Sequence, residues 1–186
     1  MRAAGYVLVG GRSSRMGVDK ALIPYRDGTL AGHVALAVLA ACGNVTLVGD
    51  PSRYRHLGHP VIPDQIAGNG PLGGVVAALT SSNDDWNLIV ACDMPNIDAD
   101  FLRGLIDDAE RAPGFPDCVV PKTAEGPQPL CALYHRRALP LLDSFLNHKF
   151  LRMRETVQSL NTAYLPFPED HWFRNLNTQE DLRANG

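Results

Sequence analysis

The sequence reads Leu8-Val9-Gly10-Gly11-Arg12-Ser13-Ser14-Arg15-Met16-Gly17-Val18-Asp19-Lys20 at the end of its first apolar run, residues 4–9. That run is short and rich in residues that favour β-strands, which predicts a buried first strand. The paired glycines after it let the backbone turn sharply and approach a ligand closely. Because two arginines and a lysine lie in the same loop, the stretch predicts a cradle for the phosphates of a nucleotide.

This loop matches neither of the common phosphate-binding signatures. It lacks the Gly-Lys-Ser/Thr ending of a P-loop, and its glycines do not have the dinucleotide-binding spacing. The alternative interpretation is a glycine-rich turn with a solvated basic rim. An isolated glycine pair would favour that turn, whereas the whole string favours phosphate binding.

The bulk composition indicates one soluble domain. A chain of 186 residues with 45% hydrophobic content is long enough for one buried core, so we expect a single domain over residues 1–186. A net charge of -3 argues against a general nucleic-acid or membrane-surface binder. No signal-peptide pattern or membrane-length apolar run is present in the sequence, so we expect a cytoplasmic protein.

The cysteines do not form a metal or redox motif. They are widely spaced, with no Cys-x-x-Cys pair, and we expect buried reduced thiols. The cysteines are Cys42, Cys92, Cys118 and Cys131.

Strand-length apolar runs alternate with segments of helical period. The expected strands are 6–9, 45–48, 61–62, 88–92, 118–121, 131–134 and 163–165, and the expected helices are 30–41, 72–79, 101–109, 137–146, 152–160 and one beginning near Thr178. This alternation predicts an α/β fold with a mostly parallel sheet covered by helices on both faces. The informative loops all follow strands, so residues 10–20, 64–74 and 93–95 should converge at the carboxyl edge of the sheet.

Asp93 follows the fourth expected strand in Cys92-Asp93-Met94-Pro95. Mg²⁺ binds one or two carboxylates together with water and substrate phosphate oxygens, so one well-placed aspartate is enough for a magnesium site. An aspartate that only begins a turn is the alternative. Combined with the first loop, the pattern favours the metal role.

Asp64 precedes a second glycine-rich stretch that contains Gly70 and Pro71. Proline suits the first turn of a helix, and the free N–H groups of that turn can face an anion. A purely structural loop remains the competing interpretation here.

Five ordered segments resemble the molybdenum cofactor guanylyltransferases, and together they cover nearly the whole chain. They are Leu8 to Lys20, Asp64 with Gly70-Pro71-Leu72, Cys92 to Pro95, Pro129 to Tyr134, and Asn175 to Leu182. The resemblance implies a three-layer, Rossmann-like nucleotidyltransferase fold with a mixed, mostly parallel sheet. It also implies transfer of GMP from GTP to the terminal phosphate of molybdopterin, with release of pyrophosphate.

The resemblance implies the site residues and partners as well. Arg15 and Lys20 would hold the triphosphate and Asp93 would hold Mg²⁺, which suits a reaction in which two phosphate groups repel one another. The guanine nucleotide would contact Leu8, Val9, Gly10, Gly11 and Asp64, and the pterin-phosphate side would be lined by Asn175 and Asn177. Molybdoenzymes or their chaperones would be transient partners.

Two features depart from the family pattern. Val9 stands where alanine is usual, and the segment 147–152 replaces a glycine followed by a basic residue. Either Lys149 or Arg152 could supply the missing charge. Trp172, close to Asn175 in sequence, is a hypothetical shelter for the pterin ring.

Three alternatives remain open from the sequence. A cytidylyltransferase of the same cofactor, or an enzyme acting on another small phosphate acceptor, would share this apparatus. The Gly10-Gly11 pair resembles the guanine-using branch. A non-catalytic nucleotide sensor or delivery protein is the third alternative, and the presence of both Lys20 and Asp93 argues against it.

Overall fold

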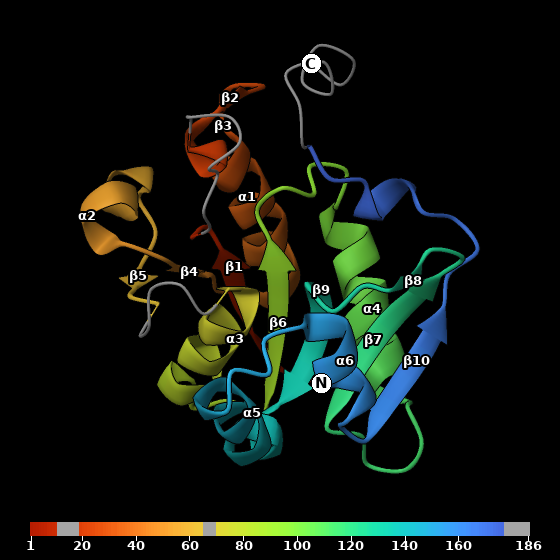
Figure 1. Ribbon diagram of the computed structural model, residues 1–186. Helices are drawn as coiled ribbons and strands as arrows, with labels where there is room; N and C mark the ends of the chain where they lie inside the picture. Colours follow the sequence, from red (N-terminus) through yellow and green to blue (C-terminus); the bar gives the residue numbers. More distant parts are fainter. Residues whose placement is uncertain (11–18, 65–69, 177–186) are drawn as a thin grey trace.

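The computed structural model describes residues 1–10, 19–64 and 70–176. In these ranges eight strands form one sheet, with the order β10-β7-β9-β6-β1-β4-β5 and β8 paired to β7 (Figure 1). The strands are β1 (Ala3–Leu8), β4 (Thr46–Val48), β5 (Val61–Ile62), β6 (Trp86–Ala91), β7 (Cys118–Thr123), β8 (Gly126–Pro127), β9 (Cys131–His135) and β10 (Thr162–Pro166). A separate small hairpin joins β2 (Pro24–Tyr25) to β3 (Gly28–Thr29).

The sheet is mixed and mostly parallel, which confirms the predicted fold class. β1 pairs in parallel with β4 and β6, and β4 pairs in parallel with β5. β9 runs antiparallel between β6 and β7, whereas β10 is parallel to β7. All seven predicted strands are present within a few residues of their expected ends.

Helices cover both faces of the sheet. α1 (Leu30–Cys42) and α4 (Ala99–Glu110) contact each other on one face, while α3 (Gly70–Ser81) and α5 (Leu139–Asn147) contact each other on the other (Figure 1). α6 (Met153–Gln158) lies on the same face as α3 and α5, because its residues Met153 and Val157 are buried in one hydrophobic cluster with residues of those two helices. None of the helices in the described ranges is long and apolar enough to cross a membrane.

The helix ends have clear local causes. Thr29 caps α1, since its Oγ1 accepts a hydrogen bond from the Gly32 backbone N–H at 3.1 Å, and Gly43 ends the helix with a φ of 74°. Asp98 caps α4 by accepting from Phe101 N–H at 2.8 Å. The expected terminal helix near Thr178 lies outside the described residues.

Some short elements have no equivalent among the predictions. Each of them is too short to show a hydrophobic period. They are the β2–β3 hairpin, α2 (Pro51–Tyr54) and the 3-10 turns η1 (Lys20–Leu22), η2 (Arg55–Leu57), η3 (Arg136–Ala138) and η4 (His171–Phe173). The cysteine prediction is confirmed for Cys92, Cys118 and Cys131, which are buried free thiols, whereas Cys42 is a free thiol that is only half-buried.

β1 is the point at which the strand order reverses. α1 leads from β1 to β4 on one side, and α3 leads from β5 back across to β6 on the other side of β1. The two connections therefore lie on opposite faces of the sheet and lead toward opposite edges of it. Ligands of open α/β sheets bind in the crevice that such a reversal creates beyond the carboxyl ends of the strands.

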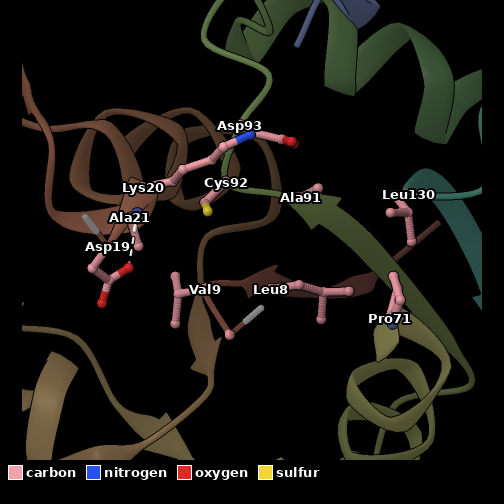
Figure 2. A pocket seen from close by; sticks show the side chains of 11 residues that line it. Leu8, Val9, Asp19, Lys20, Ala21, Pro71, Ala91, Cys92, Asp93 and Leu130 are labelled. Carbon is pink, nitrogen blue, oxygen red and sulfur yellow. Dashed lines mark hydrogen bonds between the residues drawn. The ribbon is translucent and has the colours of Figure 1, made fainter. Parts of the chain in front are cut away.

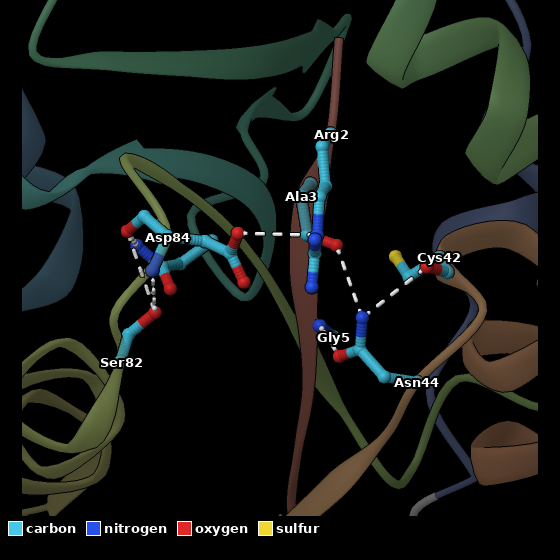
Figure 3. A network of polar contacts seen from close by, with 8 residues as sticks. Arg2, Ala3, Gly5, Cys42, Asn44, Ser82 and Asp84 are labelled. Atoms are coloured by element: carbon cyan, nitrogen blue, oxygen red, sulfur yellow. Dashed lines mark hydrogen bonds and ion pairs between the residues drawn. The ribbon is translucent and has the colours of Figure 1, made fainter.

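Gly5 allows α1 and its exit turn to approach β1 closely. Its backbone N–H donates to Asn44 Oδ1 at 2.9 Å, and the Asn44 amide donates back to Cys42 O at 3.2 Å and Ala3 O at 3.5 Å (Figure 3). A Cβ at position 5 would lie 2.4 Å from Val38 Cγ1 and 2.7 Å from Asn44 O. Any side chain here would therefore separate the helix layer from the central strand.

We expect Gly5→Ala to destabilise the protein by about 1–3 kcal/mol, because both the helix and the turn must move to admit the methyl group. Urea unfolding followed by circular dichroism measures this change. Gly104→Ala is the matched control, since Gly104 is exposed in α4 with nothing near its Cβ position and should gain about 0.5–1 kcal/mol from helix propensity. Equal effects of the two substitutions would contradict the close approach at β1.

Candidate functional site

An open cavity of about 220 Å³ lies beyond the carboxyl ends of β1 and β6 (Figure 2). It is the crevice expected from the reversal of strand order. The residues lining it come from five separate segments: Leu8, Val9, Gly10, Asp19, Lys20, Ala21, Pro71, Ala91, Cys92, Asp93 and Leu130. The convergence predicted for the loops after the first, third and fourth strands is therefore confirmed.

Backbone hydrogen bonds fix the floor of this cavity. Cys92 N–H donates to Leu8 O at 3.1 Å, which ties the end of β6 to the end of β1. Val9 N–H donates to Val48 O at 3.0 Å on the other side. α3 approaches closely enough for Pro71 to line the cavity because Gly74 has no side chain, and a Cβ there would lie 3.0 Å from Leu8 Cδ2.

Asp93 is the carboxylate at the end of β6. Its side chain is half-buried, and burial raises its pKa, while the positive charge of Lys20 lowers it. Ionising Asp93 in the folded protein therefore costs free energy, and Lys20 offsets only part of that cost. Among the described residues no group of three or more His, Cys, Asp or Glu side chains could hold a metal, so a cation here would use Asp93 with oxygens of a ligand.

Lys20 approaches Asp93 from the opposite wall. It is the first residue of η1, and Figure 2 shows its side chain pointing toward Asp93. Asp19 caps η1 by accepting a hydrogen bond from Ala21 N–H at 3.1 Å. The local turn therefore fixes the point from which the lysine extends.

A second cavity, of about 490 Å³, adjoins the first. Pro71 and Leu130 line both. Its other apolar lining residues are Met94, Pro127, Pro129, Leu151 and Met153, and its polar or charged lining residues are Gln128, Arg152, Arg154, Glu155 and Asn175. The two cavities together offer adjacent sites for two ligands.

The two arginines of the second cavity differ in their partners. Arg152 Nη1 donates to Glu155 Oε1 at 2.8 Å, so its charge is already paired. Arg154 is exposed, and no ion pair with another described residue engages it. Lys149 is not among the described residues that line the cavity. Of the two basic residues left open by the sequence, the structure brings Arg152 to this cavity and adds Arg154.

Asn175 reaches the second cavity because the segment after η4 is anchored to the Asp93 loop. Leu176 N–H donates to Asp93 O at 2.9 Å, and the Leu176 side chain is buried with Tyr25 and Leu30. Asn96 Nδ2 donates to His171 O at 2.8 Å and adds a second tie between the same two segments. The C-terminal part of the chain is thereby held against the end of β6.

The structure brings together most of the predicted site residues that it describes. Leu8, Val9, Gly10, Lys20 and Asp93 line the first cavity, and Asn175 lines the second. Asp64 follows β5, two strands away from β1, and is not among the described residues lining either cavity. The remaining predictions, Gly11, Arg15 and Asn177, lie outside the described residues.

Trp172 has a packing environment instead of a place in either cavity. Its ring stacks on Phe101 with centroids 4.8 Å apart and an interplanar angle of 19°, and Phe167 lies edge-on at 6.4 Å. The structure does not support the predicted pterin shelter at this residue. Trp172 instead packs η4 against Phe101 of α4.

Sequence reasoning missed Arg154 and the role of Leu130. The signal for Leu130 was present, because it belongs to the Pro129 to Tyr134 segment of the family pattern. Arg154 is the second residue of the short helix α6, and from sequence alone such an arginine is indistinguishable from a solvated surface charge.

Comparisons with known proteins agree on one family. A family model described as "MobA-like NTP transferase domain" matches residues 5–162. A Deinococcus radiodurans protein named "Probable molybdenum cofactor guanylyltransferase" is 35% identical over 176 residues, covering 95% of this chain and 90% of the relative. A Nostoc protein of the same name is 34% identical over 181 residues, covering 95% and 86%.

A solved structure gives the same result. The crystal structure of molybdopterin-guanine dinucleotide biosynthesis protein A from Archaeoglobus fulgidus is similar to this chain with a TM-score of 0.82 and 25% identity. The similarity covers 98% of this chain and 96% of that one. It therefore extends over both cavities as well as the sheet.

We expect Asp93→Asn to raise the Tm of the ligand-free protein near neutral pH. The raised pKa of Asp93 means that the folded state disfavours the ionised carboxylate, and asparagine removes that cost. As the pH falls through the folded pKa, the wild-type carboxyl takes up a proton, so the difference in Tm should shrink in acid. Thermal unfolding over a pH series measures this, and a lower Tm for the variant at neutral pH would contradict it.

Proposed function

The chain belongs to the molybdenum cofactor guanylyltransferases, within the MobA-like NTP transferases, and on this premise we propose that it transfers GMP from GTP to the terminal phosphate of molybdopterin. It is a nucleotidyltransferase. The products of the proposed reaction are the molybdopterin guanine dinucleotide and pyrophosphate.

The observation that carries the proposal is the meeting of Lys20 and Asp93 in the first cavity, next to a second cavity that shares Pro71 and Leu130 with it. A group transfer between two phosphorylated substrates needs one site for the donor, one for the acceptor, and charge that neutralises both where they meet. The first cavity suits the donor nucleotide and the second suits the acceptor.

The donor side is built from backbone and one lysine. The Gly10 backbone follows β1, and Pro71 stands in the first turn of α3, where N–H groups without helical partners favour an anion. Lys20 supplies a full positive charge for the triphosphate. Gly11, Arg15 and Asp64 belong to the donor side on the family pattern.

Asp93 is the residue that would hold Mg²⁺. A single half-buried carboxylate facing an open cavity fits a cation that takes its remaining ligands from water and phosphate oxygens. A bound Mg²⁺ supplies electrostatic stabilisation of the charge that develops on the phosphate oxygens. Burial raises the pKa of Asp93 and the charge of Lys20 offsets part of that rise, so Lys20 favours the ionised carboxylate that a cation needs.

Arg154 and Asn175 form the acceptor side of the proposal. Both line the second cavity, and a guanidinium is suited to recognise the planar pattern of phosphate oxygens. Because Arg152 is paired with Glu155, Arg154 is the arginine that can pair more readily with a charged ligand. Asn177 belongs to the same side on the family pattern.

The reaction needs no nucleophile from the protein. An oxygen of the acceptor's terminal phosphate forms a bond to the α-phosphorus of GTP, the bond from that phosphorus to the bridging oxygen of the β-phosphate breaks, and pyrophosphate leaves. Lys20 neutralises charge on the departing pyrophosphate, and Arg154 orients the attacking phosphate. Positioning and charge neutralisation therefore provide most of the rate enhancement.

Incubation of the purified protein with Mg²⁺, metal-loaded molybdopterin and GTP should give the guanine dinucleotide and pyrophosphate, and EDTA should abolish both. Chromatography with mass detection identifies the products. A cytosine dinucleotide from CTP would preserve the mechanism and change the base. GTP binding without any product would favour the sensor or a different acceptor.

We expect Arg154→Met to raise the KM for the acceptor by about ten- to a hundred-fold, since a hydrogen bond to a charged group contributes about 1.5–3 kcal/mol. The KM for GTP should change little, because Arg154 lines only the second cavity. Arg111→Met, at the exposed end of α4, is the matched control. A larger effect from Lys149→Met than from Arg154→Met would assign the acceptor contact to the other residue.

A further inference from the structure

We propose that Tyr54 and Arg53, at the end of α2, are positioning residues that orient Lys20 by holding the carboxylate oxygen Oδ2 of Asp19, a residue that lines the donor cavity, turned toward α2. None of the residues placed on the donor or acceptor side comes from the segment between β4 and β5, which contains both side chains. The inference rests on the proposed role of Lys20 in binding phosphates.

Asp19 makes contacts with both of its carboxylate oxygens. Oδ1 accepts a hydrogen bond from Ala21 N–H at 3.1 Å, and this bond caps the turn that carries Lys20. Oδ2 accepts a hydrogen bond from Tyr54 OH at 2.9 Å and pairs with Arg53 Nη2 at 2.5 Å. The carboxylate is thus fixed at both oxygens, and its Oδ2 is turned toward α2.

The support for Asp19 is rigid because Tyr54 is packed on all sides. Tyr54 is only 2% exposed, and the Asp19 side chain is 13% exposed. The ring lies so close to the backbone after β4 that a Cβ on Gly49 would stand 2.9 Å from Tyr54 Cε2 and 2.8 Å from Val9 Cγ2. Gly49 N–H in turn donates to Ile62 O at 2.9 Å, which joins this turn to β5.

α2 itself begins at a fixed point. Asp50 accepts from Ser52 N–H at 2.8 Å and from Ser52 Oγ at 2.7 Å, and Pro51 occupies the first helical position. The helix is short, so tertiary contacts must hold it. Asp19 provides the contact that connects it to the phosphate-binding side of the sheet.

The electrostatic reason for such an arrangement is the charge of the ligand. A free Asp19 carboxylate would repel a triphosphate and compete with it for the adjacent Lys20. Pairing with Arg53 satisfies the carboxylate, and Lys20 remains directed toward Asp93 (Figure 2). Burial raises the pKa of Tyr54 far above its ordinary value, so its hydroxyl stays a hydrogen-bond donor.

The test is a double-mutant cycle with Mg²⁺ and inorganic tripolyphosphate as the probe, measured by isothermal titration calorimetry. Tripolyphosphate reports on the phosphate site without depending on the base or the acceptor. The four proteins are the wild type, Tyr54→Phe, Lys20→Met and the double variant. Tyr54→Phe removes one hydroxyl and keeps the ring that fills the space beside Gly49.

We expect Tyr54→Phe to weaken tripolyphosphate binding by about two- to ten-fold in the wild-type background, as the loss of one net hydrogen bond predicts. In the Lys20→Met background the same change should have little effect, because there is no lysine left to orient. Equal fold-changes in both backgrounds would mean a general structural effect and would overturn the proposal.

Three further variants separate positioning from folding. Arg53→Lys should retain more binding than Arg53→Met, because lysine preserves the charge beside Asp19. Tyr164→Phe, on exposed β10, is the matched tyrosine control and should leave binding unchanged. Thermal unfolding of each variant shows whether a loss of binding accompanies a loss of stability.

The outcomes also distinguish this inference from the proposed function. If Lys20→Met leaves tripolyphosphate binding unchanged, the assignment of Lys20 to the phosphates is wrong and the orienting role falls with it. If Lys20→Met weakens binding but Tyr54→Phe has no effect, only the positioning role is wrong. If the cycle shows coupling while no dinucleotide forms from GTP, the positioning role stands and the assigned reaction is wrong.

Discussion

The pairing of β1 with parallel strands on both sides is the constraint on which the rest of the structure depends. Because β4 and β6 both run parallel to β1, each connection must cross a face of the sheet, and α1 crosses from β1 to β4 on one face while α3 crosses from β5 to β6 on the other. Their divergence opens the first cavity directly beyond Leu8 and Cys92. Gly5 and Gly74 allow the helix layers to approach this strand closely, so the cavity walls are set by the same contacts that form the core.

The charges of Asp93 and Lys20 suit the binding of a ligand better than they suit the stability of the empty protein. Burial raises the pKa of Asp93, so ionising this carboxyl costs free energy. Lys20 points toward Asp93 but offsets only part of that cost. A cation bound together with a triphosphate would neutralise both side chains, because Asp93 would gain a positive partner and Lys20 a negative one. A chain with a net charge of -3 can bind such an anion only through local placement of its cations.

Segments distant in sequence complete the two cavities through a few specific ties. The chain after η4 returns to the end of β6 through the hydrogen bond from Leu176 to Asp93 O, and this brings Asn175 beside the acceptor cavity. α2 contacts the other side of the donor cavity through Tyr54 and Asp19. The aromatic contact of Trp172 with Phe101 explains why a residue expected near a pterin is instead a packing residue.

The sequence alone was sufficient for the alternating strands and helices, the mostly parallel sheet and the convergence of three loops, because these follow from hydrophobic period and from the shared direction of strand ends. Asp93 could be predicted because it comes just after a strand, and Lys20 because it closes the basic loop that follows the first strand. Only the tertiary structure decided that β9 lies between β6 and β7, that Arg154 faces the second cavity while Arg152 pairs with Glu155, and that Asp19 turns toward Tyr54. These features depend on which residues meet across long separations in the chain, and local pattern carries no information about such meetings.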